Sequence, residues 1–221
     1  MLTVHGLTKS FQTATEPVPV LSELSFTLEQ GASLALMGRS GSGKSTLLNI
    51  LCGLERPDAG VISVAGEHFD SHNDLHRHEQ RWASLRRQKI GVVFQDANLM
   101  PALSLLDNVR LRAQLAGQPD TDCVSWLELL DIGHLASRYP DQVSGGQRQR
   151  AALAMVFAMK PALILADEPT GNLDRHTADE VANALFRLQA DSGCALILAT
   201  HDTELAAQCM HRLDLAHTIS V

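Results

Sequence analysis

Nine consecutive residues have the types and spacing needed to hold a chain of phosphates. Residues 38–46 fit the pattern G-x-x-x-x-G-K-[ST], with Gly38, Gly43, Lys44 and Ser45 at its fixed positions. In this pattern backbone N–H groups and a helix N-terminus converge on the anion, the lysine reaches the β- and γ-phosphates, and the hydroxyl holds Mg²⁺. We therefore expect a nucleotide site formed by Gly38, Arg39, Ser40, Gly41, Ser42, Gly43, Lys44, Ser45 and Thr46.

A surface turn rich in serine and glycine is the alternative interpretation of this stretch. The flanking residues argue against it, because residues 33–37 form an apolar run typical of a buried strand and residues 46–52 resemble a helix. A strand, a glycine-rich turn and a helix in this order are the context that a phosphate-binding loop requires. The context therefore favours the phosphate loop.

Two carboxylates follow another apolar run and could supply the acidic groups of such a site. Residues 163–166 indicate a buried strand, and Asp167 and Glu168 come directly after it. Asp167 can hold Mg²⁺ opposite Ser45, and Glu168 can orient or deprotonate a water near the γ-phosphate. Each carboxylate could instead merely cap the next element. Their presence in a chain with a phosphate loop favours the chemical role.

The elements that must position these residues alternate along the chain. Apolar and alternating runs predict strands at residues 2–5, 24–28, 33–37, 61–64, 90–94, 163–166 and 196–199. Helical patterns predict helices at residues 46–52, 73–88, 144–159 and 177–189, and residues 16–19 are expected to form a loop. This alternation predicts an α/β fold with a mainly parallel core sheet and ligands beyond the strand carboxyl ends. Gln95, Asp167, Glu168 and His201 all fall at such ends.

The domain organisation follows from a change of pattern after residue 95. Residues 96–159 show helical spacing only, whereas residues 1–95 and 160–221 carry the predicted strands. We expect a single domain over residues 1–221, in which a helical subdomain is inserted into a core with an N-terminal antiparallel β-subdomain.

Bulk composition excludes several classes of protein. The net charge is −7, with 18 basic against 25 acidic residues, which argues against a surface that binds nucleic acid. There is no secretory signal in residues 1–5 and no apolar run long enough to span a membrane, and the four cysteines lack C-x-x-C spacing and suit a reducing cytosol. His68, His72, His76 and His78 cluster without a metal-ligand spacing, so we expect a solvated helix face rather than a metal site.

Residues 144–147 resemble the signature motif of the ABC-transporter ATPases. The other motifs of that family occur in the expected order: the phosphate loop, Gln95 as the Q-loop, Asp167-Glu168 as Walker B, Asp174 in the D-loop and His201 as the H-loop. The match spans about residues 2 to 215, and it implies a P-loop NTPase fold and an ATPase that uses ATP and Mg²⁺.

The resemblance also implies a role for each matched residue. Lys44, Gln95, Glu168 and His201 would act in hydrolysis, with Gln95 contacting Mg²⁺ or the attacking water and His201 contacting the γ-phosphate. The γ-phosphate bound by one chain would also be contacted by a second copy, through Ser144, Gly145, Gly146 and Gln147, and Asp174 would bridge the two sites. Phe11 would stack on adenine, the alternative being a core phenylalanine.

Longer strings resemble one branch of the family, the lipoprotein-release and macrolide-export group. These strings are residues 89–95, 98–101, 106–109 and 167–174. In that group a dimer of ATPases on the cytoplasmic face of the inner membrane drives a separate permease. The resemblance implies the same for this chain, with a docking surface around residues 97–104 that includes Leu99, Met100 and Leu103. The transported substrate is not encoded here.

A soluble ABC ATPase that acts on DNA or ribosomes is the alternative function. DNA-repair members insert a long coiled coil between the phosphate loop and the signature, but only about 100 residues without heptads separate Lys44 from Ser144. Translation-type members carry two such domains in one chain. A small-molecule kinase would have no use for the signature motif. We therefore expect the transport ATPase.

Overall fold

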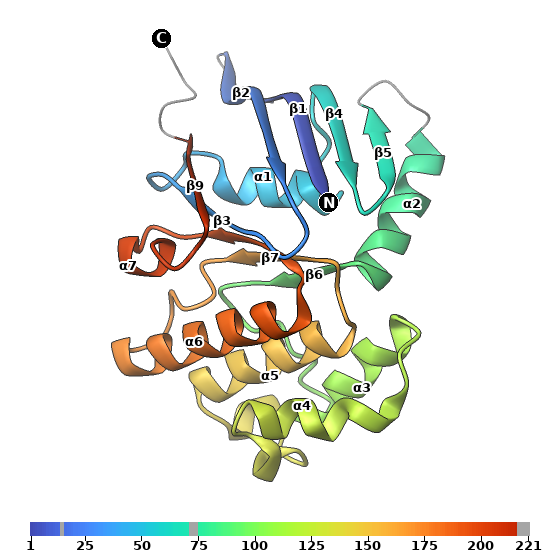
Figure 1. The fold of residues 1–221 in the computed structure, drawn as a ribbon, viewed down its shortest axis with the longest axis vertical. Coiled ribbons are helices and arrows are strands. Elements are labelled where there is room, and N and C mark those ends of the chain that lie inside the picture. The colour runs from blue at the N-terminus through green and yellow to red at the C-terminus, as the bar shows by residue number, and fades with distance from the viewer. Residues whose placement is uncertain (14–15, 71–74, 216–221) are drawn as a thin grey trace.

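The structure is a computed structural model that describes residues 1–13, 16–70 and 75–215, although the side chains of residues 75–77 and 121 are not described. It has an α/β fold with an antiparallel sheet at one end, a parallel sheet in the middle and helices at the other end (Figure 1). The fold class expected from the sequence is confirmed.

The antiparallel sheet has the strand order β2-β1-β4-β5. Its strands are β1 (Leu2–Gln12), β2 (Pro17–Leu28), β4 (Ala59–Val64) and β5 (Glu67–Asp70). The predicted loop at residues 16–19 is wrong, because Pro17 pairs with Gln12 and Pro19 pairs with Ser10. Proline is tolerated here because β2 is an edge strand, whose outward N–H positions need no ladder partner. The short strand β5 was not predicted.

The parallel sheet has the strand order β6-β7-β8-β3-β9, and every pair in it is parallel. Its strands are β3 (Ser33–Met37), β6 (Ile90–Val93), β7 (Leu163–Asp167), β8 (Ala195–Ala199) and β9 (His211–Asp214). All residues of β3 and β8 are buried. Burial on both faces explains why these strands are continuous apolar runs rather than alternating ones. The edge strand β9 was not predicted, since it is short and polar.

Helix α1 (Lys44–Leu51) lies between the two sheets (Figure 1). Leu47, Ile50 and Leu51 are fully buried against strands of both sheets. Burying each of these side chains stabilises the fold by about 1.5–3 kcal/mol. The helix that begins within the phosphate loop is therefore fixed by the core.

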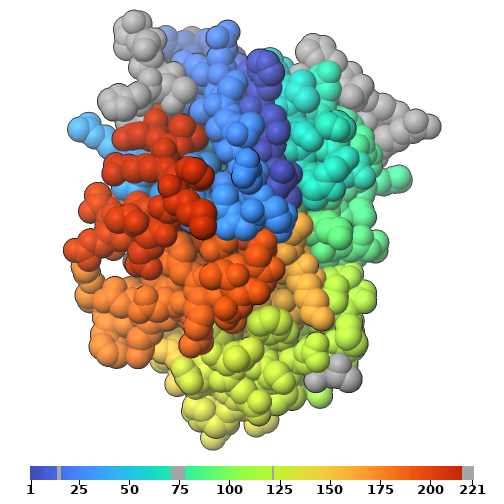
Figure 2. Space-filling view, in the orientation of Figure 1, coloured from blue at the N-terminus to red at the C-terminus, as the bar shows by residue number. Residues whose placement is uncertain are grey.

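Of the remaining helices, the one at residues 75–88 packs on the same side of the parallel sheet as α1, through Trp82 and Leu85, and the others pack against the opposite face or against each other (Figure 1). The remaining helices are α2 (Leu75–Gln88), α3 (Leu105–Leu115), α4 (Cys123–Leu129), α5 (Gly145–Ala158), α6 (Arg175–Ser192) and α7 (Thr203–Ala206). The first two residues of the helix predicted at 73–88 lie outside the described residues. In Figure 2 the yellow-green residues of α3 and α4 form the end of the molecule opposite the blue N-terminal strands. The division into residues 1–95, 96–159 and 160–221 stays a prediction.

The four cysteines are free and behave as small core residues. Cys52, Cys123 and Cys194 are buried and Cys209 is half-buried. Burial raises the pKa of each thiol, and it raises the pKa of Cys209 to about 11. Unreactive thiols of this kind have no catalytic role in the site described below.

Candidate active site

The phosphate loop connects β3 to α1 and curls around its own lysine. Lys44 is buried, and its Nζ donates hydrogen bonds to the carbonyl oxygens of Gly38 (2.8 Å) and Arg39 (3.3 Å). Gly43 has φ 93°, and a Cβ atom there would lie 2.7 Å from Val20 Cγ1, so only glycine fits this turn. The loop therefore holds an ammonium group at its centre, where an anion would be bound.

One hydroxyl inside this loop supports the same chemistry. Ser42 Oγ is buried and has no hydrogen-bond partner among the described residues. A Cβ atom at Gly38 would lie 2.3 Å from it, so the loop closes tightly around this group. A buried hydroxyl without a partner is costly unless a ligand accepts its hydrogen bond. A phosphate oxygen is an acceptor that would satisfy it.

A pocket of about 800 Å³ opens over the loop. This volume lies within the usual range for sites that hold a cofactor-sized ligand. The pocket gathers residues from six separate parts of the chain, which are Phe11, Val20, residues 39–41 and 43–46, Gln95, residues 167–168 with Gly171, and His201. Most of the predicted site residues therefore line one cavity. Of the predicted site residues, Gly38, Ser42, Ser144, Gly145, Gly146, Gln147 and Asp174 do not line it.

Glu168 occupies a sharp turn at the carboxyl end of β7. Its backbone has φ 45°, in the left-handed region, and its N–H donates to the carbonyl oxygen of Ala199 at 2.9 Å. Such a conformation is uncommon for a residue with a side chain and is concentrated at functional sites. The turn directs the side chain toward the end of β8, the next strand in the sheet.

Two consecutive residues at the end of β8 hold the Glu168 carboxylate. Nδ1 of His201 lies 2.9 Å from Oε1, and the hydroxyl of Thr200 donates to Oε2 at 3.3 Å. Thr200 is buried, and the sequence analysis did not identify it. The sequence offers one indication that Thr200 belongs to the site, its position directly before His201. Its contact with Glu168 depends on the pairing of β7 with β8.

Gln95 contacts the segment that follows the Walker-B-like carboxylates. Its Nε2 donates a hydrogen bond to Oδ1 of Asn172 at 2.9 Å, and Nδ2 of Asn172 donates to Oδ1 of Asp96 at 3.0 Å. Neither Asn172 nor Asp96 was identified as a site residue from the sequence. Asn172 is the first residue of the predicted D-loop, Asn172-Leu173-Asp174, and this was the local indication.

Oxygen atoms suited to Mg²⁺ occur together in this pocket. The Ser45 hydroxyl, the Asp167 carboxylate and the Gln95 amide all line it. Asn172 engages the nitrogen of the Gln95 amide, so the oxygen is the atom that remains for a cation. The donor set therefore fits Mg²⁺, which takes few protein ligands and completes its shell with phosphate and water.

Phe11 lines the pocket, and 41% of the residue is exposed. The ring is therefore not a core phenylalanine. Nζ of Lys9 lies 5.0 Å from the ring centroid, and Lys9 is fixed by ion pairs with Glu55 (2.6 Å) and Asp58 (3.7 Å). The geometry leaves an exposed aromatic face at the pocket, as base stacking requires.

The signature residues begin α5, away from the pocket of the same chain. Ser144 caps this helix, because its Oγ accepts from Gln147 N (3.3 Å) while Gln147 Oε1 accepts from Ser144 N (2.8 Å). A Cβ atom at Gly145 would lie 3.4 Å from Leu173 Cδ2, and one at Gly146 would lie 2.2 Å from Thr177 Cγ2. The start of α5 thus packs on Leu173, just before α6, and on Thr177 in the first turn of α6.

Asp174 is the N-cap of α6. Its Oδ1 accepts from Thr177 N at 3.1 Å and its Oδ2 accepts from Thr177 Oγ1 at 2.6 Å. These hydrogen bonds hold the pKa of the Asp174 carboxyl below its usual range. Asp174 is exposed, so another molecule can reach it although its carboxylate is bonded to Thr177.

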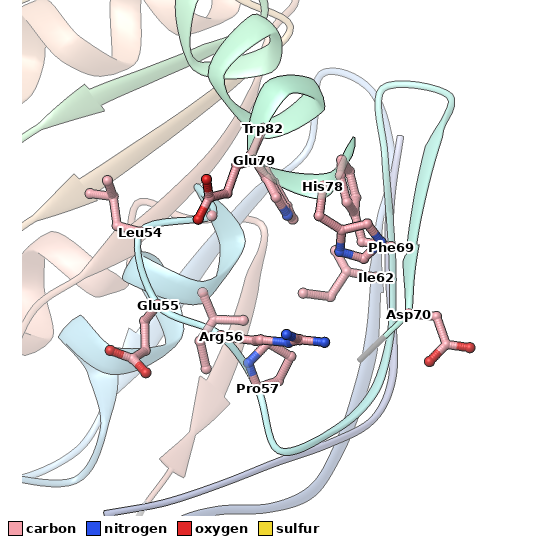
Figure 3. Close-up of a pocket in the computed structure, with 12 residues that line it drawn as sticks. Leu54, Glu55, Arg56, Pro57, Ile62, Phe69, Asp70, His78, Glu79 and Trp82 are labelled. Carbon is pink, nitrogen blue, oxygen red and sulfur yellow. The ribbon is translucent and has the colours of Figure 1, made fainter. Parts of the chain in front are cut away.

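A second, smaller cavity of about 200 Å³ lies beside α2 and does not have the chemistry of a phosphate site (Figure 3). Phe69 and Trp82 stack there with ring centroids 3.8 Å apart, and the lining has three acidic residues, Glu55, Asp70 and Glu79, against one arginine, Arg56. Acidic groups repel an anion, and the volume is below the usual range for ligand sites.

His78 also lines this cavity and packs edge-on against Phe69 with ring centroids 5.4 Å apart. The expectation of a solvated helix face is therefore wrong for His78, which is half-buried, and for His68, which is exposed but lies on strand β5. His72 lies outside the described residues, and the side chain of His76 is not described.

None of the helices in the described ranges has both the length and the apolar content needed to cross a bilayer.

Comparison with known proteins gives a consistent picture. Residues 21–171 match the family model described as ABC transporter. The chain is similar to the lipoprotein-releasing system ATP-binding protein LolD 1 of Rhodopirellula baltica, with 42% identity over 97% of this chain and 93% of that protein. It is also similar to the ABC transporter ATP-binding protein YbbA of Escherichia coli K12, with 41% identity over 97% of this chain and 93% of that protein.

A solved structure has the same fold. It is described as a dimeric post-hydrolysis state of the ATP-binding cassette MJ0796 bound to ADP and Pi. It superposes with a TM-score of 0.83 and 31% identity, covering 97% of this chain and 94% of that chain.

Proposed function

Since this chain belongs to the ABC transporter family, as an ATP-binding subunit that hydrolyses ATP, we propose that it works as a homodimer that drives a separate membrane permease. We further propose that the permease is of the lipoprotein-release or macrolide-export type, and that the subunit acts at the cytoplasmic face of the inner membrane. The alternative, an ATPase that acts on DNA or ribosomes, is not favoured, because the similar proteins are named as transporter components.

The observation that carries this proposal is the pocket shared by the phosphate loop, Gln95, the Asp167–Glu168 pair and His201. In it Lys44 and the backbone N–H groups of the loop bind the β- and γ-phosphates. Asp167 and Ser45 would hold Mg²⁺, which neutralises charge on the phosphates when bound. Lys44, the backbone N–H groups and the cation would thus stabilise the negative charge that develops on the transferred phosphoryl group.

Glu168 acts on the attacking water in this proposal. Its carboxylate accepts a proton from the water or orients it toward the γ-phosphorus. His201 contacts Oε1 of Glu168 through Nδ1, which leaves Nε2 to contact the γ-phosphate, and Thr200 donates to Oε2. The carboxylate is therefore oriented before the nucleotide arrives, which reduces the entropy cost of reaching the reactive geometry.

A second copy completes the site in this proposal. Ser144, Gly145, Gly146 and Gln147 start α5, where a helix N-terminus with two glycines can approach an anion without obstruction. They do not line the pocket of their own chain, so they are available to the γ-phosphate bound by a partner. The similar cassette MJ0796, which is described as dimeric and bound to ADP and Pi, supports the dimer.

The permease would dock on residues 97–104. Met100 is half-exposed there and presents an apolar side chain to solvent. Asn108 fixes the backbone around it, since its Oδ1 accepts from Met100 N (2.7 Å) and its Nδ2 donates to the carbonyl oxygens of Met100 and Leu103 (both 3.2 Å). A rigid segment with an exposed thioether side chain suits a helix of a partner protein.

Phosphate release by the purified chain tests the enzymatic part of this proposal. We expect release that needs ATP and Mg²⁺, that stops with excess EDTA, and that is absent from Lys44→Ala. Purification from detergent-solubilised membranes then tests the partner. Recovery of a multi-span membrane protein supports the permease, whereas recovery of ribosomes or DNA alone would overturn the transport function.

A further inference from the structure

Both the oxygen and the nitrogen of the Asn172 side-chain amide make hydrogen bonds. Its Oδ1 accepts a hydrogen bond from Gln95 Nε2 at 2.9 Å, and its Nδ2 donates one to Asp96 Oδ1 at 3.0 Å. The three residues are exposed, and they come from two loops at the carboxyl ends of the neighbouring strands β6 and β7. The bridge therefore joins two loops that the sequence separates by more than seventy residues.

Gly171 permits this bridge. A Cβ atom at this position would lie 3.0 Å from Gln95 Nε2, closer than ordinary packing allows. A larger residue would push the Gln95 side chain away from Asn172. The pair Gly171-Asn172 therefore combines close approach with a hydrogen-bonding amide at the same point.

The same segment continues to the start of α5. Leu173 lies against Gly145, and Thr177 lies against Gly146, as the short distances from their side chains indicate. Residues 171–177 thus contact Gln95 at one end and the signature glycines at the other. A displacement of Asn172 would therefore change the contacts with Gln95 and with the signature glycines.

We propose that Asn172 is a positioning residue for Gln95 in ATP hydrolysis, a proposal that rests on the ATPase function proposed above. The amide of Asn172 holds the Gln95 nitrogen, so the Gln95 oxygen is directed to the cation or to the attacking water. Without this bond an exposed glutamine populates several rotamers, and ordering them costs free energy in each cycle. The bridge to Asp96 in turn fixes which end of the Asn172 amide faces Gln95.

The chemistry requires an amide at position 172. An alanine offers neither a donor nor an acceptor. An aspartate keeps an acceptor for Gln95, but it cannot donate to Asp96 and places two carboxylates against each other. Asn172→Ala and Asn172→Asp should therefore both impair the step that Gln95 serves.

Steady-state ATPase kinetics of the full chain test the proposal. We expect Asn172→Ala and Asn172→Asp to lower kcat by about tenfold or more, because a misplaced group at the reaction centre has an effect of this size. We expect KM for ATP to change by less than about twofold, since the phosphate loop is untouched. Asn183→Ala is the matched control, because Asn183 is exposed on α6 and its side chain makes no hydrogen bond to the described residues. It should keep the wild-type kcat.

A double-mutant cycle separates positioning from a general structural effect. If Asn172 acts through Gln95, the double variant Gln95→Ala/Asn172→Ala loses no more activity than Gln95→Ala alone. If the two losses multiply, Asn172 does not act through Gln95 and the proposal is overturned. Unfolding midpoints show whether Asn172→Ala is folded, and if it is not, Asp96→Ala tests the other end of the bridge with the same cycle.

The outcomes also distinguish this proposal from the ATPase function. A wild-type chain without Mg²⁺-dependent hydrolysis, or a Lys44→Ala variant that still hydrolyses ATP, would overturn the function. An active wild-type chain whose kcat is unchanged by Asn172→Ala would overturn only the positioning role.

Discussion

The side chains of Glu168 and His201 are in direct contact, with Oε1 and Nδ1 2.9 Å apart. Because Thr200 donates to the other carboxylate oxygen, two neighbouring residues at the end of β8 orient a carboxylate at the end of β7. The contact depends on the parallel pairing of these strands, which places both carboxyl ends at one edge of the sheet.

The Glu168→Gln variant should bind ATP and fail to hydrolyse it. The amide keeps the size of the side chain but cannot take a proton from water, so we expect phosphate release to fall by at least about 100-fold. ATP-bound dimers should then accumulate, as measured by light scattering with and without ATP. Glu79→Gln is the control, because Glu79 is exposed on α2 and remote from the phosphate loop. A monomer at saturating ATP would contradict the dimer.

The Lys44→Ala variant should lose nucleotide binding. The change removes the ammonium group at the centre of the loop and its bonds to Gly38 and Arg39. We expect binding of a fluorescent ATP analogue to weaken by at least about tenfold, because charged hydrogen bonds to phosphate are worth about 1.5–3 kcal/mol each. Lys160→Ala removes an exposed lysine and should bind normally. Unchanged affinity in Lys44→Ala would exclude this loop as the phosphate site.

The Phe11→Ala variant tests the stacking role of the exposed ring. Base stacking on an aromatic side chain is worth about 1–3 kcal/mol, so we expect KM for ATP to rise by about tenfold while kcat is kept. Phe11→Trp should retain a low KM, because it keeps an aromatic face. A KM that is the same in all three proteins would assign Phe11 no role in nucleotide binding.

Gly145→Ala and Gly146→Ala should have different effects on stability. The Cβ atom at Gly146 would lie 2.2 Å from Thr177 Cγ2, and Thr177 cannot turn away because its Oγ1 donates to Asp174. We therefore expect Gly146→Ala to lower the free energy of unfolding by about 1–3 kcal/mol. The Cβ atom at Gly145 meets only an ordinary contact, so that variant should unfold at the wild-type urea concentration.

The rate of phosphate release tests whether Gly145 also has a role at the partner's nucleotide. Its Cβ atom would stand at the helix N-terminus that we expect to face the partner's γ-phosphate. We therefore expect phosphate release from Gly145→Ala to fall by about tenfold or more although the fold is intact. Full activity in this variant would argue against the head-to-tail dimer.

Asp174 should give a pH-dependent contribution to stability. Hydrogen bonds from Thr177 lower its pKa in the folded state, so the folded chain favours the carboxylate. The contribution is fully present above the unfolded pKa of about 4 and is lost as the pH falls from there through the lowered folded pKa. Urea unfolding midpoints of wild type and Asp174→Asn should differ at neutral pH and converge below about pH 4. Asp191→Asn, an exposed change on the same helix, should show no such convergence.

The sequence alone determined the local parts of this protein. Residues that are close in the chain form three kinds of feature: the phosphate loop, the apolar runs of β3, β7 and β8, and the capped start of α5. Their patterns therefore predicted the elements and the family. The same reasoning failed at residues 16–19, since two prolines indicated a loop while pairing with β1 made them part of an edge strand.

The tertiary structure decided which distant residues meet. Thr200 reaches Glu168 because β7 pairs with β8, and Asn172 reaches Gln95 because β6 pairs with β7. Neither contact has a pattern in the sequence, because each joins groups more than thirty residues apart. The order of the strands in the parallel sheet fixes these pairs. Local spacing thus determined which chemical groups are present, and long-range strand pairing determined how each group is held.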